Sequence, residues 1–206
     1  MRKGIGICCI LLGLACLLAS AGFVIYNKLE AESGAESSRT LLQDVQEKME
    51  EPMQTEAGLP EQPVAEPFLE SEPREMATVP VGDYDSIGIL SIPVLKLELP
   101  VLTDWSYEKL KKAPCHYHGS CYEPDFVIAA HNYPSHFGRL SELQQGDLIL
   151  FTDATGEVHC YEVVLLETLS PTATEEMITS GFDLSLYTCT PGGSNRVTVR
   201  CRTANK

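Results

Sequence analysis

The residues best suited to chemistry lie on either side of one turn near the C-terminus. The segment Leu186–Arg200 runs from apolar and aromatic residues through Pro-Gly-Gly-Ser-Asn and back into Val-Thr-Val. This pattern predicts a β-hairpin in which Cys189 ends one strand and Arg196 begins the next. A nearby cation favours the thiolate, and a guanidinium can hold an oxyanion. The pair therefore predicts nucleophilic chemistry, against the simpler interpretation of a buried cysteine and a surface arginine.

An imidazole that could complete such a site follows an apolar segment upstream. Phe126–Ala130 has the composition of a strand, and His131 comes directly after it. Strand ends suit active sites because the strand fixes the backbone while the adjoining loop admits the substrate. His136, five residues further on, is the main rival. The remaining histidines are interpreted as surface or hydrogen-bonded residues: His116, His118 and His159.

These residues resemble the sortases, membrane-anchored cysteine transpeptidases of Gram-positive bacteria. In that family one strand ends in Ala-His or Gly-His, a later strand ends in Thr-Cys, and an Arg opens the last strand. Here the same order is given by Ala130-His131, Thr188-Cys189 and Arg196. The combined pattern is far more specific than any one part, and the resemblance covers about residues 83–202. The gap of six residues between Cys189 and Arg196 is shorter than in several sortase classes, so we assign no class.

The resemblance implies a role for each member of this set. Cys189 would attack the carbonyl after the threonine of an LPxTG-like sorting signal, Arg196 would stabilise the oxyanion, and His131 would act as acid and then base. The implied partners are a surface protein or pilin that carries the signal, and an amine from a peptidoglycan precursor or a pilin lysine. Thr188, Ala130 and Asn132 are expected to contact the substrate. Residues 166–182 are expected to line its groove.

The sequence indicates no cofactor, assigns no metal ligands, and leaves calcium activation undecided. Nucleotide, haem and flavin motifs are absent from it, and the acidic residues are too dispersed to define a calcium site. The net charge of −14 argues against nucleic-acid binding, which usually needs a basic surface.

Residues 1–26 predict an uncleaved anchor in the cytoplasmic membrane. After two basic residues, no charged side chain occurs from Ile5 to Tyr26, and about 20 apolar residues suffice to cross a bilayer. The flanking charges favour a cytoplasmic N-terminus and an extracellular remainder. The alternative is a signal peptide cleaved near Ala19-Ser20-Ala21, but this apolar run exceeds the usual signal core of about 7–15 residues.

Residues 27–82 predict an acidic, proline-rich linker. They contain 13 acidic and four basic side chains, and the prolines recur from Pro52 to Pro80. Such a composition favours an extended, self-repelling chain, with a short helix around Leu41–Met49 as an allowed exception. Glu66-Pro67-Phe68 loosely resembles the lid segment of pilin-type sortases, but a solvated linker is the default interpretation.

Residues 83–206 predict an all-β catalytic domain. Short strands are separated by turns at a spacing typical of a closed barrel or sandwich, and the resemblance implies an eight-stranded barrel with short helices. The expected strands are residues 87–92, 97–102, 126–130, 148–152, 158–167, 184–189 and 197–201. Helical turns are expected at Ser106–Lys112, with Ser106 as the N-cap, and at Ser141–Gln145.

The remaining cysteines and the function leave alternatives open. Cys115 and Cys121 could form a disulfide, join nearby histidines in a cramped metal site, or stay unpaired. Cys160 and Cys201 are interpreted as sheet residues. Besides a sortase, the chain could be a tethered structural or adhesive β-domain with an inert Cys189, or another cell-wall cysteine transpeptidase. The Ser-x-Gly-Cys-x-Arg motif of L,D-transpeptidases is absent around Cys189.

Overall fold

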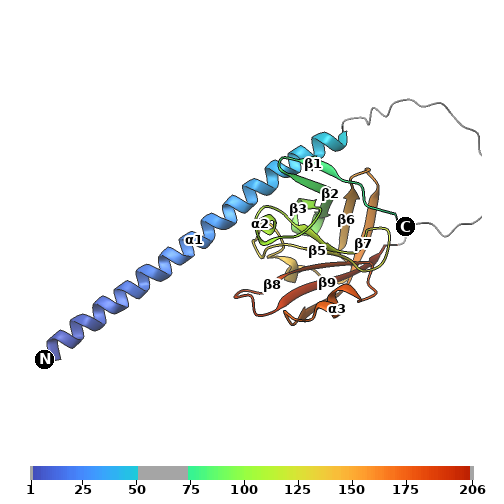
Figure 1. Ribbon diagram of the computed structural model, residues 1–206. Helices are drawn as coiled ribbons and strands as arrows, with labels where there is room; N and C mark the ends of the chain where they lie inside the picture. Colours follow the sequence, from blue (N-terminus) through green and yellow to red (C-terminus); the bar gives the residue numbers. More distant parts are fainter. Residues whose placement is uncertain (1, 51–73, 205–206) are drawn as a thin grey trace, which may run out of the picture.

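Short strands follow one another through most of the computed structural model, which describes residues 2–50 and 74–204 (Figure 1). Nine strands form one sheet in the order β1-β2-β3-β4-β5-β8-β9-β7-β6, and β2 also pairs with β6. This second pairing closes β2 to β9 into an eight-stranded barrel and confirms the predicted fold. The strands are β1 Val79–Val81, β2 Tyr84–Ile92, β3 Leu97–Leu102, β4 Cys115–His118, β5 Phe126–Ala129, β6 Leu148–Asp153, β7 Val158–Leu169, β8 Leu184–Cys189 and β9 Arg196–Thr203.

Alternating side chains explain why these segments are strands. In β6, Ile149, Phe151 and Asp153 are buried while the residues between them are partly or fully exposed. The strand therefore covers the core with one face, as period-two patterning requires. The barrel interior is filled by side chains from most of its strands, including Phe126, Leu184, Leu186 and Val199.

Closure of the barrel depends on a glycine in β2. Gly88 has φ +145, and a Cβ at this position would lie 2.1 Å from the carbonyl oxygen of Thr152 in β6. Because no other residue fits this approach, Gly88 allows β2 to pair with β3 on one side and with β6 on the other.

Two small strands were not expected. β1 pairs with β2, and β4 pairs antiparallel with β5. The sequence of β4, Cys-His-Tyr-His, lacks the alternation that identifies a strand. The sequence analysis therefore did not include it among the expected strands. The short helices agree better with the prediction. In α2, Tyr107–Leu110, the Ser106 hydroxyl accepts the backbone N–H of Lys109 at 3.2 Å. The others are α3 Thr174–Ile178, η1 Pro93–Leu95 and η2 Leu140–Glu142.

The N-terminal helix differs most from the expectation. α1 extends from Arg2 to Glu50, so residues 27–50 are helical rather than an extended linker. Burial explains the difference, because Leu41 and Val45 pack against Val81 and Leu102 of the barrel. Figure 1 shows the N-terminal part of α1 projecting from the barrel while its last turns run beside β1. The rest of the predicted linker, residues 51–73 with Glu66-Pro67-Phe68, lies outside the described residues.

Candidate active site

The predicted hairpin is formed by β8 and β9, and it places a thiol opposite a cation. Cys189 and Arg196 are Cα partners in the antiparallel register. The turn is closed by Thr190, whose N–H donates to the Asn195 carbonyl at 2.9 Å and whose hydroxyl accepts the Asn195 N–H at 3.1 Å. Backbone pairing therefore holds the Cα atoms of Cys189 and Arg196 about 5 Å apart.

His131 reaches the same end of the sheet through the neighbouring strand. β5 and β8 are parallel, with Ala129 opposite Tyr187, and the N–H of Ala130 donates to the Tyr187 carbonyl at 3.2 Å. His131 and Cys189 each follow this pair by two residues. Three adjacent strand ends thus bring together the three residues that the sequence analysis selected.

The His131 ring is half-buried and held on two sides. Its Nδ1 lies 3.2 Å from Oδ1 of Asn132, and its plane stacks on Tyr133 with ring centroids 4.3 Å apart and 6° between the planes. Within the described residues Nε2 has no hydrogen bond. That nitrogen can therefore exchange a proton with a substrate.

Arg196 keeps part of its guanidinium free for a ligand. One terminal nitrogen, Nη1, donates to the carbonyls of Gly193 and Asn195, each at 3.2 Å. These bonds anchor the side chain to its own loop. The other nitrogens make no hydrogen bond within residues 2–50 and 74–204, so they can donate to an oxyanion.

A groove of about 220 Å³ opens beside these strand ends. Cys189, Arg196 and Ala130 line it, whereas His131, the residue after Ala130, is not among the lining side chains. The expected groove segment, residues 166–182, contributes one wall through Pro171, Ala173, Thr174 and Met177.

The opposite wall is aromatic, and the sequence analysis missed it. Trp105, Tyr107 and Tyr117 line the groove together with Tyr187 of β8. Trp105 lies 5.7 Å from both Tyr107 and Tyr117, and Tyr117 lies edge-on to Tyr187 at 5.3 Å. Tyr107 is 78% exposed, which is unusual for a side chain of this size away from a binding surface.

The three residues expected to contact substrate take different positions. Ala130 lines the groove. Thr188 is 3% exposed, and its hydroxyl donates to the Ala130 carbonyl at 2.8 Å. Asn132 contacts the His131 ring. Thr188 and Asn132 therefore support the backbone and the imidazole, and their contact with a substrate stays a prediction.

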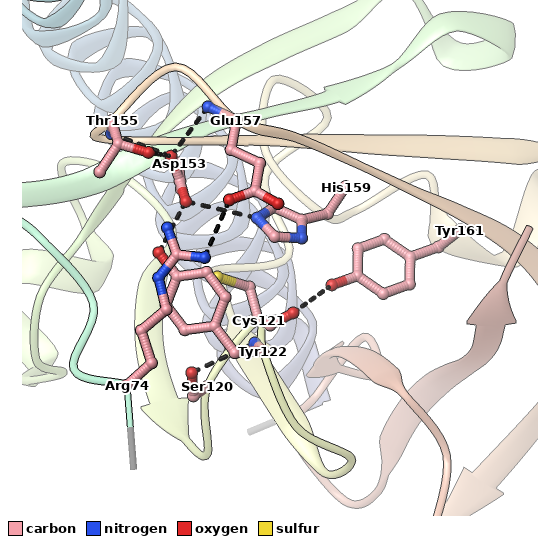
Figure 2. Close-up of polar contacts among 9 residues, drawn as sticks. All are labelled: Arg74, Ser120, Cys121, Tyr122, Asp153, Thr155, Glu157, His159 and Tyr161. Atoms are coloured by element: carbon pink, nitrogen blue, oxygen red, sulfur yellow. Dashed lines mark hydrogen bonds and ion pairs between the residues drawn. The ribbon is translucent and has the colours of Figure 1, made fainter. Parts of the chain in front are cut away.

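A second thiol and imidazole meet elsewhere, together with a carboxylate (Figure 2). Ligand atoms of Cys121, Asp153 and His159 all lie within 4.8 Å of one another. Cys121 and His159 line a cavity of about 510 Å³ that Thr203 also lines. Since β9 begins at Arg196 and ends at Thr203, this cluster and the His131–Cys189–Arg196 site occupy opposite ends of the strand, about 23 Å apart.

Asp153 uses its oxygens to hold the β6–β7 hairpin. Oδ1 accepts from the Thr155 N–H at 2.9 Å, the Thr155 hydroxyl at 2.6 Å and the Glu157 N–H at 3.0 Å. Oδ2 accepts from the Tyr122 hydroxyl at 2.7 Å and faces Nε2 of His159 at 3.4 Å. Burial opposes ionisation, but the bonds from Thr155, Tyr122 and His159 outweigh it and hold the pKa of Asp153 at about 2.

Cys121 is a poor nucleophile in this setting. It is 8% exposed, and burial, with a smaller contribution from the Asp153 charge, raises the pKa of its thiol to about 11. Arg74 lies nearby but is occupied, with its guanidinium 3.9 Å above the Tyr122 ring and 3.0 Å from Glu157. The cluster therefore joins a loop to a hairpin, and its carboxylate has little capacity left for a metal ion.

The other cysteines also fit structural roles. Burial raises the pKa of Cys115 and of Cys201 to about 12. Cys115 packs beneath α1 and Cys121 packs in the barrel core, and neither is in a disulfide. The ring of His116 lies between the carbonyls of Thr103 and Gly119, at 3.0 and 2.7 Å. In the segment Cys115–Cys121, which suggested a disulfide or a cramped metal site, the two cysteines and His116 thus lie in different environments.

His136, the rival of His131, lies away from the groove. It is fully buried, and burial lowers its pKa to about 4. A side chain sealed in this way cannot shuttle protons to a substrate in the groove.

Comparison with known proteins identifies the family. The family model of the sortase domain matches residues 90–204. The chain belongs to the sortase family. No curated protein sequence matches this sortase.

Solved sortases share its fold. Sortase A from Corynebacterium diphtheriae is 23% identical with a TM-score of 0.54, and the match covers 60% of this chain and 63% of that one. Sortase C1 from Streptococcus suis is 29% identical with a TM-score of 0.52, covering 59% and 74%. A sortase C from Clostridium perfringens, solved with the C-terminal cell wall sorting motif, is 22% identical with a TM-score of 0.54, covering 61% and 74%. This sortase thus spans less than two thirds of the Corynebacterium protein.

Proposed function

We propose that this sortase is a cysteine transpeptidase that cleaves a C-terminal, LPxTG-like sorting signal. The observation that supports the proposal is the adjacency of β5, β8 and β9: Cys189 and Arg196 face each other and line an open groove, and His131 follows the neighbouring strand end. The apolar and aromatic lining of the groove suits the leucine and proline of such a signal. A structural neighbour solved with a cell wall sorting motif supports the same substrate class.

The first half of the proposed reaction forms a thioester. The Cys189 sulfur attacks the carbonyl carbon that follows threonine, and the carbonyl electron pair moves onto oxygen. Arg196 donates to this oxyanion from the part of its guanidinium that the loop leaves free. As the C–N bond breaks, His131 gives a proton to the leaving amine.

The second half transfers the acyl group. An amine of a peptidoglycan precursor or a pilin lysine loses a proton to His131 and attacks the thioester, and Cys189 leaves as thiolate. The first half leaves His131 without its proton, the second half returns a proton to it, and the complete cycle restores the starting protonation states of His131 and Cys189. Transfer must compete with hydrolysis, and the aromatic wall and α3 reduce access of water to the thioester.

We also propose that residues 1–26 anchor the enzyme in the cytoplasmic membrane with the barrel, from about residue 83, outside. The apolar side chains of α1 before Asn27 are exposed in the described residues, among them Leu11, Leu14, Leu18 and Phe23. One helix of this length and composition could cross a bilayer. The charges around it favour a cytoplasmic N-terminus.

Two thiols of similar exposure provide the test of this function. Cys189 and Cys160 are both half-buried, but only Cys189 lies among His131 and Arg196. The proposal predicts that iodoacetamide labels Cys189 much faster than Cys160, and that His131→Gln and Arg196→Met slow labelling at Cys189 alone. Equal labelling of the two thiols, insensitive to both substitutions, would instead indicate a tethered structural domain.

A further inference from the structure

The half of α1 beyond the apolar span packs along the barrel. Val45 is fully buried and Leu41 nearly so, and both pack with Val81, Leu102 and Ala113. Lys111, next to α2, pairs with Glu30 of the helix at 2.8 Å. Contacts thus run from Glu30 to the end of α1, and they fix the helix against the strands that precede the groove.

This packing reaches the groove itself. Leu110 packs against the α1 contact and also lines the groove. Figure 1 shows α2 between α1 and the barrel strands. One wall of the substrate groove therefore rests on the N-terminal helix.

A glycine marks the closest approach of α1 to the loop that carries the catalytic histidine. A Cβ on Gly34 would lie 2.8 Å from the Lys111 carbonyl oxygen and 3.0 Å from two ring carbons of Tyr133. Such distances leave no room for a side chain. Gly13 and Gly22, on the same helix, would meet nothing within 4 Å.

Tyr133 connects this contact to His131. Its ring is 7% exposed, with the backbone of Gly34 against it and the imidazole of His131 stacked in parallel at 4.3 Å. The ring cannot turn without losing one of these contacts. A movement of α1 at Gly34 is therefore transmitted to the imidazole.

The contact also contains buried polar atoms without hydrogen-bond partners in the described part of the chain. Tyr133 Oη, Ser135 Oγ and both ring nitrogens of His136 are buried without a hydrogen-bond partner of good geometry, although the Gly34 backbone faces His136. Ser38, one turn after Gly34, has a buried hydroxyl in the same condition. Apolar residues would make a more stable contact, so shape and position better explain these residues.

We propose that the extramembrane half of α1 is part of the active-site scaffold, and that Gly34 and Tyr133 are positioning residues that set the ring of His131. The inference rests on the proposed role of His131 as acid and base. On this inference, the part of α1 that follows the apolar span helps to hold the catalytic centre in place.

The matched pair Gly34→Ala and Gly22→Ala tests the inference in the full chain in detergent micelles. Both changes add one methyl group to the same helix and raise helix propensity equally. We expect Gly22→Ala to leave sorting-peptide turnover unchanged. Gly34→Ala should lower kcat on the order of 10- to 100-fold with little change in KM, because the imidazole is displaced while the groove remains.

A second pair separates positioning from folding. Tyr133→Phe keeps the stacked ring and should keep both activity and the ring-shifted NMR signal of His131. Tyr133→Leu removes the ring and should lose the shift together with activity. The His131 signal can be assigned among five histidines by its loss in His131→Gln.

The outcomes distinguish failure of the inference from failure of the proposed function. Equal turnover and equal His131 shifts in Gly34→Ala and Gly22→Ala would overturn the inference while leaving an active sortase. A wild-type chain that turns over no sorting peptide would overturn the proposed function. In that case the His131 shift in Gly34→Ala still reports whether α1 sets the ring.

Discussion

A cysteine and a histidine lie near each end of β9, yet their surroundings differ in every respect that matters for nucleophilic chemistry. At the start of the strand, Cys189 borders an open groove and faces Arg196. At its end, Cys121 is buried beside the ionised Asp153, which raises the pKa of the thiol further above its usual value. The first surroundings leave the thiol accessible beside a cation, and the second favour a neutral thiol.

The comparison teaches that a thiol, an imidazole and a carboxylate in proximity do not make a catalytic triad. In the second cluster the carboxylate is committed to backbone N–H groups of the hairpin, and the sulfur lacks access. In the first, the fixed charge of Arg196 lies across the strand pair from Cys189. Exposure and the sign of the neighbouring charge distinguish the two sites.

Replacing each cysteine in turn should give the largest difference in peptide turnover between the two sites. Cys189→Ala should lower peptide turnover by a factor on the order of 10⁴ to 10⁶, as expected for loss of a nucleophile. Cys121→Ala should keep turnover within a few-fold while lowering stability. Turnover by the purified full chain, with thermal unfolding as the control for folding, measures both. The reverse pattern would move the active site to the other end of the barrel.

Two arginines, one near each end of β9, test whether the effect of charge on turnover is specific to one site. Arg196→Ala should reduce kcat about 10²- to 10³-fold, because an oxyanion donor is lost. Arg202→Ala is the matched control, since Arg202 is exposed at the opposite end and contacts Gly181 and Asp183. Its turnover should equal that of wild type. Equal losses in both variants would show that general surface charge accounts for the effect.

Substitution of Asp153, in the cluster at the other end of β9, should lower the stability of the fold. Asp153→Ala removes the acceptor of several hydrogen bonds and should lower the free energy of unfolding by about 2–3 kcal/mol. Asp147→Ala, which removes one backbone bond from Gln144, should cost about 0.5–1 kcal/mol. Denaturant unfolding measures the difference. Comparable costs for the two variants would contradict the structural role given to Asp153.

Acid should lower the stability of the fold in two pH windows, one set by His136 and one by Asp153. Burial lowers the pKa of His136 from 6.5 to about 4. The neutral, buried His136 therefore contributes about 3 kcal/mol to the free energy of unfolding above pH 6.5, and this contribution is lost as the pH falls to 4. Asp153 has its pKa lowered from 3.8 to about 2, so its smaller contribution, about 2 kcal/mol, is lost between those values. Unfolding measured against pH should show the upper window flattened in His136→Asn and the lower one in Asp153→Asn.

The sequence predicted the barrel because most strands have clear apolar patterns bounded by turns. It identified Cys189 and Arg196 because local pairing across one turn brings them together, and His131 because a strand end is readable. The aromatic wall of Trp105 and Tyr117 was not predictable, since these residues meet only after separate loops fold together.

Other features were missed because tertiary burial overrides local composition. The acidic residues after Asn27 favoured an extended linker, yet Leu41 and Val45 gain enough from burial against the barrel to continue the helix. Thr188 was expected at the substrate, but its inward direction at the end of β8 gives its hydroxyl to the Ala130 carbonyl. Which face a strand-end residue presents depends on register, which sequence alone leaves open.

The mass of a trapped acyl-enzyme tests the central claim most directly. The full chain would be mixed with a panel of sorting-signal peptides without an acceptor amine, quenched, and analysed by intact mass and peptide mapping. We predict a mass increase equal to the signal up to its threonine, carried by Cys189 as a thioester, absent in Cys189→Ala and retained in Cys121→Ala. An adduct on Cys121, or none with any peptide, would contradict the account.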